Sequence, residues 1–210
     1  ALAGALVVPG TIGGSGFSRI IGTSLLAQGQ SSRSVPKAQP VDEQYTQLIR
    51  QYLQDDRIST ELVDHLPASD TVPTPLKFLG RAVGAPGELT YAKDIQRYYE
   101  ALAKASPRAK FWTIGKTEEG RDIVALAIAN ESTIAGLDRN KEMLASLTDP
   151  RRTTEAQAQQ ILQTAKPVYY ITSGMHSPEN GGPETPAELG HPPLVRETPP
   201  IRGISHHTTT

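Results

Sequence analysis

The chain has 210 residues, of which 37% are hydrophobic, and 21 basic and 22 acidic residues leave a net charge of −1. The two signs alternate along the chain, so no basic surface for nucleic acid is expected. Because cysteine is absent, disulfides, thiolate zinc sites and a cysteine nucleophile are excluded, and any metal must be held by His, Asp or Glu.

Residues 1–40 are predicted to form a Pro/Gly-rich leader and linker. Within residues 17–30, a basic residue, a short apolar run and small residues near Ala27 and Gly29 are typical of a secretory signal. A glycine-rich disordered leader is the alternative. No membrane span is expected, since residues 1–8 are far shorter than the roughly 20 apolar residues that a bilayer requires. The signal-like pattern favours a secreted or periplasmic bacterial protein.

Residues 41–90 are predicted to contain one helix and an extended arm. Apolar residues in 42–54 recur at helical spacing, beginning with Tyr45 and Leu48. Residues 67–90 carry several prolines and glycines, which exclude a long helix and favour an extended chain.

Residues 91–184 are predicted to form an α/β domain. A helix is expected after Thr90, its predicted N-cap, and Ser106 precedes the proline that ends it. Two apolar segments, residues 111–114 and 122–129, flank a turn and predict a β-hairpin. Further helices are expected near residues 138–147 and 154–165.

A third strand is predicted at residues 168–172, and it is expected to be buried. It leads directly into His176. Ligands of open α/β sheets bind beyond the carboxyl ends of the strands, so His176 lies where chemistry is expected.

His176 and Glu179 are the candidate metal ligands. An imidazole and a carboxylate three residues apart can bind one zinc ion if the backbone turns between them, and Pro178 stiffens that turn. A catalytic zinc takes three protein ligands and one water, so a third ligand is needed. The spacing alone also fits a surface histidine beside a surface glutamate.

Three segments together resemble the zinc carboxypeptidase family, the carboxypeptidase A-like metallopeptidases. Residues 114–123 are similar to its early hairpin, 168–176 to the strand before the first zinc ligand, and His176–Glu179 to its His-x-x-Glu motif. Residues 63–67 and the proline-rich stretch after them look like the leader of a bacterial exported subgroup. The resemblance covers roughly residues 40–184.

The resemblance implies an α/β/α sandwich around a mixed sheet, with His176 and Glu179 as the first and second ligands of a Zn cofactor. It implies hydrolysis of the last peptide bond of a chain, so the expected partners are peptide or protein C-termini. The oligomeric state is not predicted.

The chain departs from the family after Glu184. The family's third ligand, a histidine, and its general base lie a hundred or more residues after the motif, whereas 31 residues follow Glu179 here. We therefore expect only the N-terminal portion of the domain, an incomplete fold, no catalytic residue and little or no activity of the chain alone. Prolines predict an irregular, atypical tail at residues 185–210, without a rigid support for a substitute ligand among His191, His206 and His207.

Two other functions remain open. A degenerate family member could bind peptides or metal without catalysis, which the missing third ligand favours. A structural protein without metal requires the His176–Glu179 pair to be incidental.

Overall fold

The computed structural model describes residues 39–176 and 178–209. The signal-like segment predicted at residues 17–30 lies outside the described residues, as does most of the predicted linker. Among the described helices, none is both long enough and apolar enough to span a bilayer.

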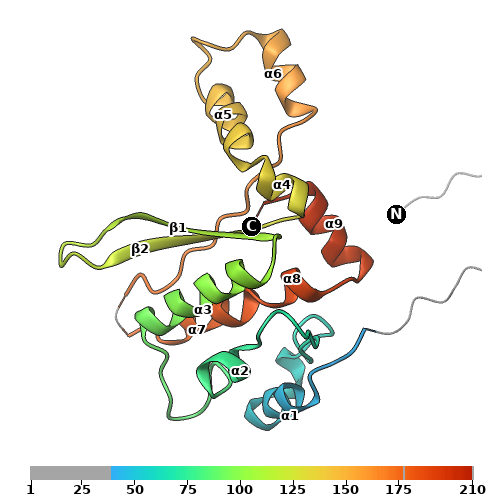
Figure 1. Cartoon of the computed structure of the whole chain (residues 1–210), viewed down its shortest axis with the longest axis vertical. Helices are drawn as coiled ribbons and strands as arrows, with labels where there is room; N and C mark the ends of the chain where they lie inside the picture. Colours follow the sequence, from blue (N-terminus) through green and yellow to red (C-terminus); the bar gives the residue numbers. More distant parts are fainter. Residues whose placement is uncertain (1–38, 177, 210) are drawn as a thin grey trace, which may run out of the picture. The chain divides into compact units, whose positions relative to one another are not determined.

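The described part of the chain consists of short helices and one β-hairpin (Figure 1). In chain order its elements are α1 (Glu43–Tyr52), a 3₁₀ turn (Asp56–Ile58), α2 (Pro75–Leu79), α3 (Ala92–Ala105), β1 (Ala109–Lys116), β2 (Asp122–Ile128), α4 (Glu131–Ala135), α5 (Leu137–Leu147), α6 (Glu155–Leu162), α7 (Gly181–Leu189), α8 (Pro192–Val195) and α9 (Pro199–His207). The predicted α/β class is therefore confirmed.

The hairpin follows the prediction closely. β1 and β2 pair antiparallel, with Trp112 opposite Ala125, and the register is irregular between Thr113 and Gly115. Among the described residues this is the whole sheet, and it has two strands. One end of the hairpin is buried, because Ala109 and Ile128 belong to the main core.

Helix α3 lies at the centre of that core. Its buried side chains Ile95, Tyr98 and Leu102 recur at three- and four-residue spacing, so they form one face of the helix. This face packs with buried residues of the hairpin, α7, α8 and the arm, namely Val72, Ala109, Ile128, Ala187 and Leu194. Residues predicted to belong to the arm, to the α/β domain and to the tail therefore share one core.

Helix α1 belongs to a second, smaller cluster built on Tyr45, Leu66 and Ala82. The side chain of Asp42 caps the helix by accepting the N–H of Tyr45 at 2.9 Å. The predicted helix at 42–54 is therefore confirmed. The predicted arm has no long helix, as expected, but it is built of turns and bends rather than extended chain, and its only helix among the described residues is the five-residue α2.

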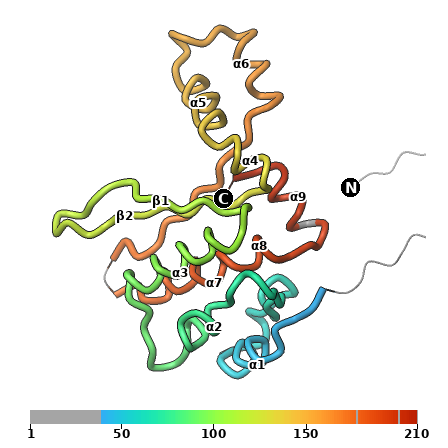
Figure 2. The backbone as a smooth tube through the Cα atoms, in the orientation of Figure 1, coloured from blue at the N-terminus to red at the C-terminus, as the bar shows by residue number. Residues whose placement is uncertain are grey.

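Helices α5 and α6 confirm the two helices expected near residues 138–147 and 154–165. They lie side by side in the Cα trace (Figure 2). Thr154 starts α6 with a capping box, because its side chain and that of Gln157 each accept the other's backbone N–H.

The strand predicted at residues 168–172 is wrong. Only a single parallel bridge forms in this segment, between Val168 and Thr209. The side chains of Tyr169 and Tyr170 are 66% and 72% exposed, so the segment is not buried. An apolar stretch becomes a sheet strand only when a neighbouring strand accepts its backbone hydrogen bonds, and no described strand does so here.

The irregular tail expected at residues 185–210 is also corrected, because α7, α8 and α9 occupy most of it. Pro192 and Pro199 begin α8 and α9. The first turn of a helix has no internal partner for its N–H groups, so a proline there costs nothing. Among the described residues of this tail, Pro186 is the proline that lies beyond the first turn of its helix, α7.

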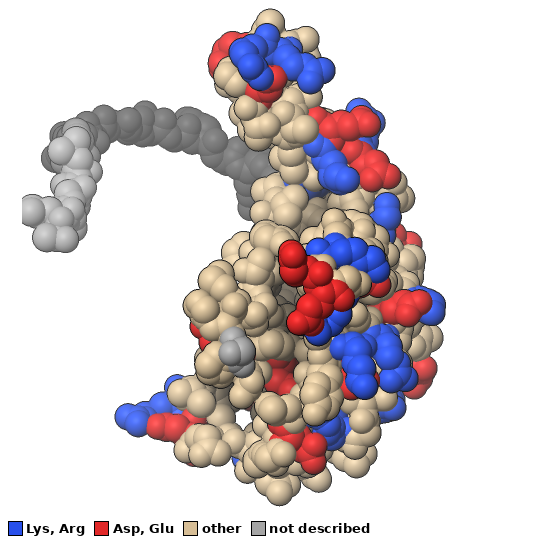
Figure 3. All heavy atoms as spheres, turned by 90° about the vertical axis from the view of Figure 1, so that its left-hand side faces the viewer, with Lys and Arg blue, Asp and Glu red and all other residues tan. Residues whose placement is uncertain are grey.

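Charged side chains of both signs lie together on the face shown in Figure 3, where lysine and arginine neighbour aspartate and glutamate, mainly on its right-hand side. This agrees with a net charge of −1 and gives no basic area for nucleic acid on that face.

Candidate metal centre

The structure brings the two predicted metal ligands together. The ring Nδ1 of His176 lies 2.6 Å from Oε1 of Glu179, and the backbone N–H of His176 donates to Oε2 at 3.3 Å. The N–H of Glu179 donates in turn to the carbonyl of His176 at 3.1 Å. The backbone turn brings an imidazole nitrogen and a carboxylate oxygen within hydrogen-bonding distance of each other.

Both side chains face solvent, with side-chain exposures of 67% for His176 and 50% for Glu179. Water therefore has access to the point where they meet. The expected burial at the tip of a sheet strand is not found, since the segment before His176 is exposed and belongs to no described strand.

Gly174 and Pro183 close the loop that carries the pair. Gly174 has a φ of +70°, which favours glycine, and a Cβ at this position would lie 3.0 Å from Cγ of Pro183. Gly182 is similarly close, because its Cβ would lie 3.3 Å from the backbone nitrogen of Gly174. The chain before His176 thus packs directly on the start of α7.

Two carboxylates of α7 fix the position of that helix. Glu184 is buried and accepts three hydrogen bonds, from the N–H of Gly84 at 3.1 Å, the N–H of Thr90 at 2.5 Å and the Thr90 hydroxyl at 2.8 Å. Glu188 accepts the hydroxyl of Tyr45 at 2.9 Å. Thr90 was predicted to cap α3, but Tyr91 occupies that position and the Thr90 side chain binds Glu184 instead.

The atoms of the pair fit a zinc ion with a small opening movement. Two donors at about 2.0–2.1 Å from a tetrahedral zinc lie roughly 3.3 Å apart. His176 Nδ1 and Glu179 Oε1 are closer than this by roughly 0.7 Å, at the distance of a direct hydrogen bond. Because the side chains are exposed, this separation can be reached by small rotations of the two side chains.

A third ligand is not found in the described part of the chain, where no three His, Asp or Glu side chains gather to hold a metal. The three histidines considered as substitutes lie elsewhere. His191 is fully buried. The Nδ1 of His206 lies 2.8 Å from the side-chain nitrogen of Asn130, and His207 ends α9.

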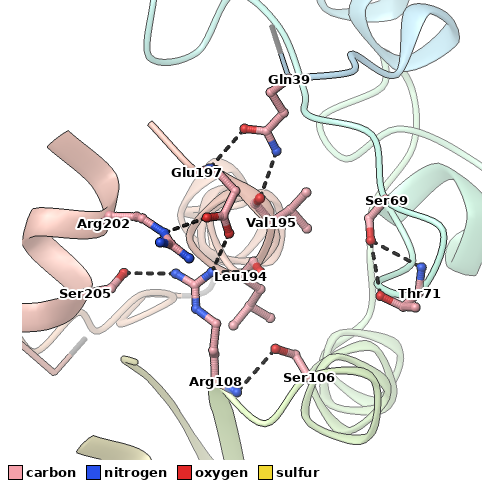
Figure 4. Close-up of polar contacts among 10 residues, drawn as sticks. All are labelled: Gln39, Ser69, Thr71, Ser106, Arg108, Leu194, Val195, Glu197, Arg202 and Ser205. Carbon is pink, nitrogen blue, oxygen red and sulfur yellow. Dashed lines mark hydrogen bonds and ion pairs between the residues drawn. The ribbon is translucent and has the colours of Figure 1, made fainter. Parts of the chain in front are cut away.

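An arginine and a glutamate hold the last two helices against the rest of the chain (Figure 4). Arg108, at the start of β1, donates to the carbonyl of Leu194 at 3.2 Å and to the hydroxyl of Ser205 at 3.4 Å. Its Nη1 is 3.5 Å from Glu197, whose other oxygen pairs with Arg202 at 2.5 Å. The contacts explain how residues 194–205 remain ordered despite their prolines.

Substitution of Gly174 by alanine is expected to destabilise the loop that presents the pair. A left-handed backbone costs an L-residue about 1–2 kcal/mol, and the added methyl also displaces Pro183. We expect a similar loss in the free energy of unfolding, measured by urea titration, together with weaker zinc binding.

Gly203→Ala is the matched control for this change. Gly203 lies in α9, and apart from the helix's own backbone no atom of the described residues lies within 4 Å of a Cβ there, so alanine is expected to stabilise by up to about 1 kcal/mol. Equal effects of the two substitutions would contradict the role assigned to Gly174.

Sequence reasoning missed the roles of Glu184 and Glu188. The two glutamates are four residues apart and so share one face of α7, but a pair of carboxylates at this spacing is common on exposed helices. Their partners are more than 90 residues away, and no local pattern indicates them.

A histidine–glutamate pair meeting at a solvent-accessible turn defines a candidate metal-binding protein. The family model described as zinc carboxypeptidase matches residues 95–208, which include the pair and most of the tail. The chain therefore belongs to the zinc carboxypeptidase family. Searches of curated proteins and of solved structures find no match.

Proposed function

We propose that this chain supplies two zinc ligands, His176 and Glu179, to a zinc-dependent carboxypeptidase that hydrolyses the last peptide bond of peptides or proteins. The convergence of Nδ1 and Oε1 at 2.6 Å carries the proposal. Membership of the zinc carboxypeptidase family supports it, because peptide hydrolysis with zinc is the activity that gives the family its name.

In such a site a bound zinc ion would polarise the carbonyl of the scissile peptide bond and lower the pKa of a bound water. His176 would offer Nδ1 and Glu179 a carboxylate oxygen as ligands. Glu184 and Glu188 would not bind the zinc. Their hydrogen bonds hold α7 in position, and the loop that carries His176 and Glu179 packs on this helix. None of the described residues is assigned the part of general base.

Zinc binding is expected to be weak and to require both residues. A four-ligand zinc site contributes about 10–16 kcal/mol, so two ligands are expected to give about half of this, a Kd between about 1 and 200 μM. Equilibrium dialysis should find one zinc per wild-type chain at saturation, and binding at this site should disappear in His176→Ala and in Glu179→Gln.

The matched control is His65→Ala. His65 also contacts a carboxylate, that of Asp64, and both are partly exposed, but they are sequence neighbours outside the motif. His65→Ala should leave zinc binding unchanged. If it removes zinc while His176→Ala does not, the assignment is wrong.

A non-catalytic module that binds metal or peptide ends is the second candidate, and the absence of a third ligand among the described residues favours it. Incubation with a peptide and excess zinc distinguishes the two. Release of the last residue, lost on chelation and in His176→Ala, would establish catalysis by this chain. Peptide binding without release would establish the binding module, and this is the result that we expect of the chain by itself.

We also propose export from a bacterial cell as the location of this protein. The basic, apolar and small residues of segment 17–30 support this. A fusion of residues 1–40 to a reporter that is active only outside the cytoplasm should be active, whereas an inactive but intact fusion would refute export.

A further inference from the structure

A cavity of about 490 Å³ is lined in part by α7, and neither His176 nor Glu179 lines it. Its walls come from residues 62–66 and 83–84 and from the three last helices. Cavities of this size commonly accept small molecules. Most of the lining is apolar, including Leu62, Val63, Leu189, Pro192, Pro193 and Ile201.

The cavity has one buried cation, Arg196, which is 4% exposed. Its Nη2 donates to the backbone carbonyl of His65 at 3.0 Å. Its Nε is buried without a hydrogen-bond partner in the described part of the chain, and no carboxylate there lies within ion-pair distance. A buried guanidinium normally has a carboxylate partner, because loss of hydration is costly for a charge.

The acidic side chains around the cavity do not supply this partner. Glu184 already accepts three hydrogen bonds from Gly84 and Thr90. Glu188 accepts the Tyr45 hydroxyl, and burial raises its pKa, so its negative charge is disfavoured. Asp64 favours the charged form of Arg196 but contacts the ring of His65.

Arg196 and His65 also line a second hollow of about 170 Å³. Arg196 therefore lines both cavities. A ligand with a small acidic head group and an apolar body would match both the cation and the larger, apolar wall.

We propose that this cavity binds a medium-chain aliphatic monocarboxylate, with its carboxylate on Arg196 and its alkyl chain along the wall that contains Leu62 and Leu189. A guanidinium recognises a carboxylate through paired, charge-assisted hydrogen bonds. The alkyl chain leaves water on binding, which is favourable in proportion to its buried area. A ligand with a second charge would place that charge against apolar side chains.

Calorimetry on the wild-type chain in a chelator tests the proposal without relying on any variant. Butanoate, hexanoate and octanoate should bind with affinities that rise about fourfold for each added methylene group. Octanoate should bind at least tenfold more tightly than octanol, which has the same chain and no charge. Equal affinities for octanoate and octanol would overturn the proposal.

Substitutions of residues that line the cavity then test where the ligand binds. Arg196→Gln should reduce the affinity for octanoate to that for octanol, whereas Arg202→Gln, an exposed arginine of α9, should not change it. Leu62 is 57% exposed, so Leu62→Asp should fold and should weaken octanoate at least tenfold. His176→Ala should have no effect, and loss of binding in that variant would move the carboxylate to the metal centre and overturn the proposal.

Discussion

Acidification from pH 7 to pH 4 is expected to destabilise this protein by about 3 kcal/mol through His191 alone. His191 is completely buried, and neither ring nitrogen has a hydrogen-bond partner within residues 39–176 and 178–209. Burial lowers its pKa from 6.5 to about 4; the nearby backbone of Val72 and the charge of Asp42 oppose this shift, and Lys77 acts in the same direction as burial.

The sign follows from the protons that each state binds. Between pH 4 and pH 6.5 the unfolded chain carries a protonated His191 and the folded chain does not. Stability from this residue is therefore present above pH 6.5 and is lost as the pH falls through about 4. Burial raises the pKa of Glu188, so its contribution has the opposite sign and decreases as the pH rises.

His191→Leu separates the two contributions, because it removes only the histidine. Urea unfolding at pH 7 and pH 4 should show the wild type losing about 3 kcal/mol more than this variant. His207→Gln, a change at an exposed histidine of α9, should behave as the wild type. Parallel pH profiles of the wild type and His191→Leu would contradict the assignment.

Glu184→Ala is expected to reduce the free energy of unfolding by about 3–5 kcal/mol, because each buried donor left without an acceptor costs about 1–3 kcal/mol. The substitution leaves three donors, on Gly84 and Thr90, without their acceptor, in a position that is 7% exposed. It also releases the arm from α7, so the loop of His176 and Glu179 should lose its support and zinc binding should weaken in parallel.

Two further variants show whether this loss comes from the hydrogen bonds. Glu184→Gln keeps one acceptor oxygen and is expected to lose about half as much stability. Glu61→Ala, a change at an exposed glutamate, should lie within about 0.5 kcal/mol of the wild type. A Glu184→Ala variant as stable as Glu61→Ala would contradict the buried network.

Local patterns predicted the local structure of this chain. The spacing of Tyr45 and Leu48 predicted α1, and the proline after Ser106 correctly placed the end of α3. The hairpin was also predicted, because its apolar strands and its turn are adjacent in the sequence. In each case the determining contacts lie within a few residues of one another.

Predictions that depended on distant partners were less successful. Residues 168–172 have the composition of a strand, but composition does not provide the neighbouring strand that must pair with it. Pro192 and Pro199 were taken as helix breakers, although at a first helical turn they are favourable. The partner of Glu184 is Thr90, 94 residues earlier, and no local pattern indicates that pair.

The candidate metal pair was predicted from sequence and its two side chains meet in the structure, because three residues and one turn suffice to join them. The third ligand could not be predicted from the same motif. A ligand contributed by another part of a chain depends on the fold that brings it near, and the described residues bring none.

The most direct test is nuclear magnetic resonance of the chain labelled with ¹⁵N at its histidine rings, during addition of zinc. We expect Nδ1 of His176 alone to shift to a metal-bound position, while the rings of His65, His191, His206 and His207 do not change. A zinc-dependent shift of any of those four, with His176 unchanged, would contradict the assignment of the metal centre.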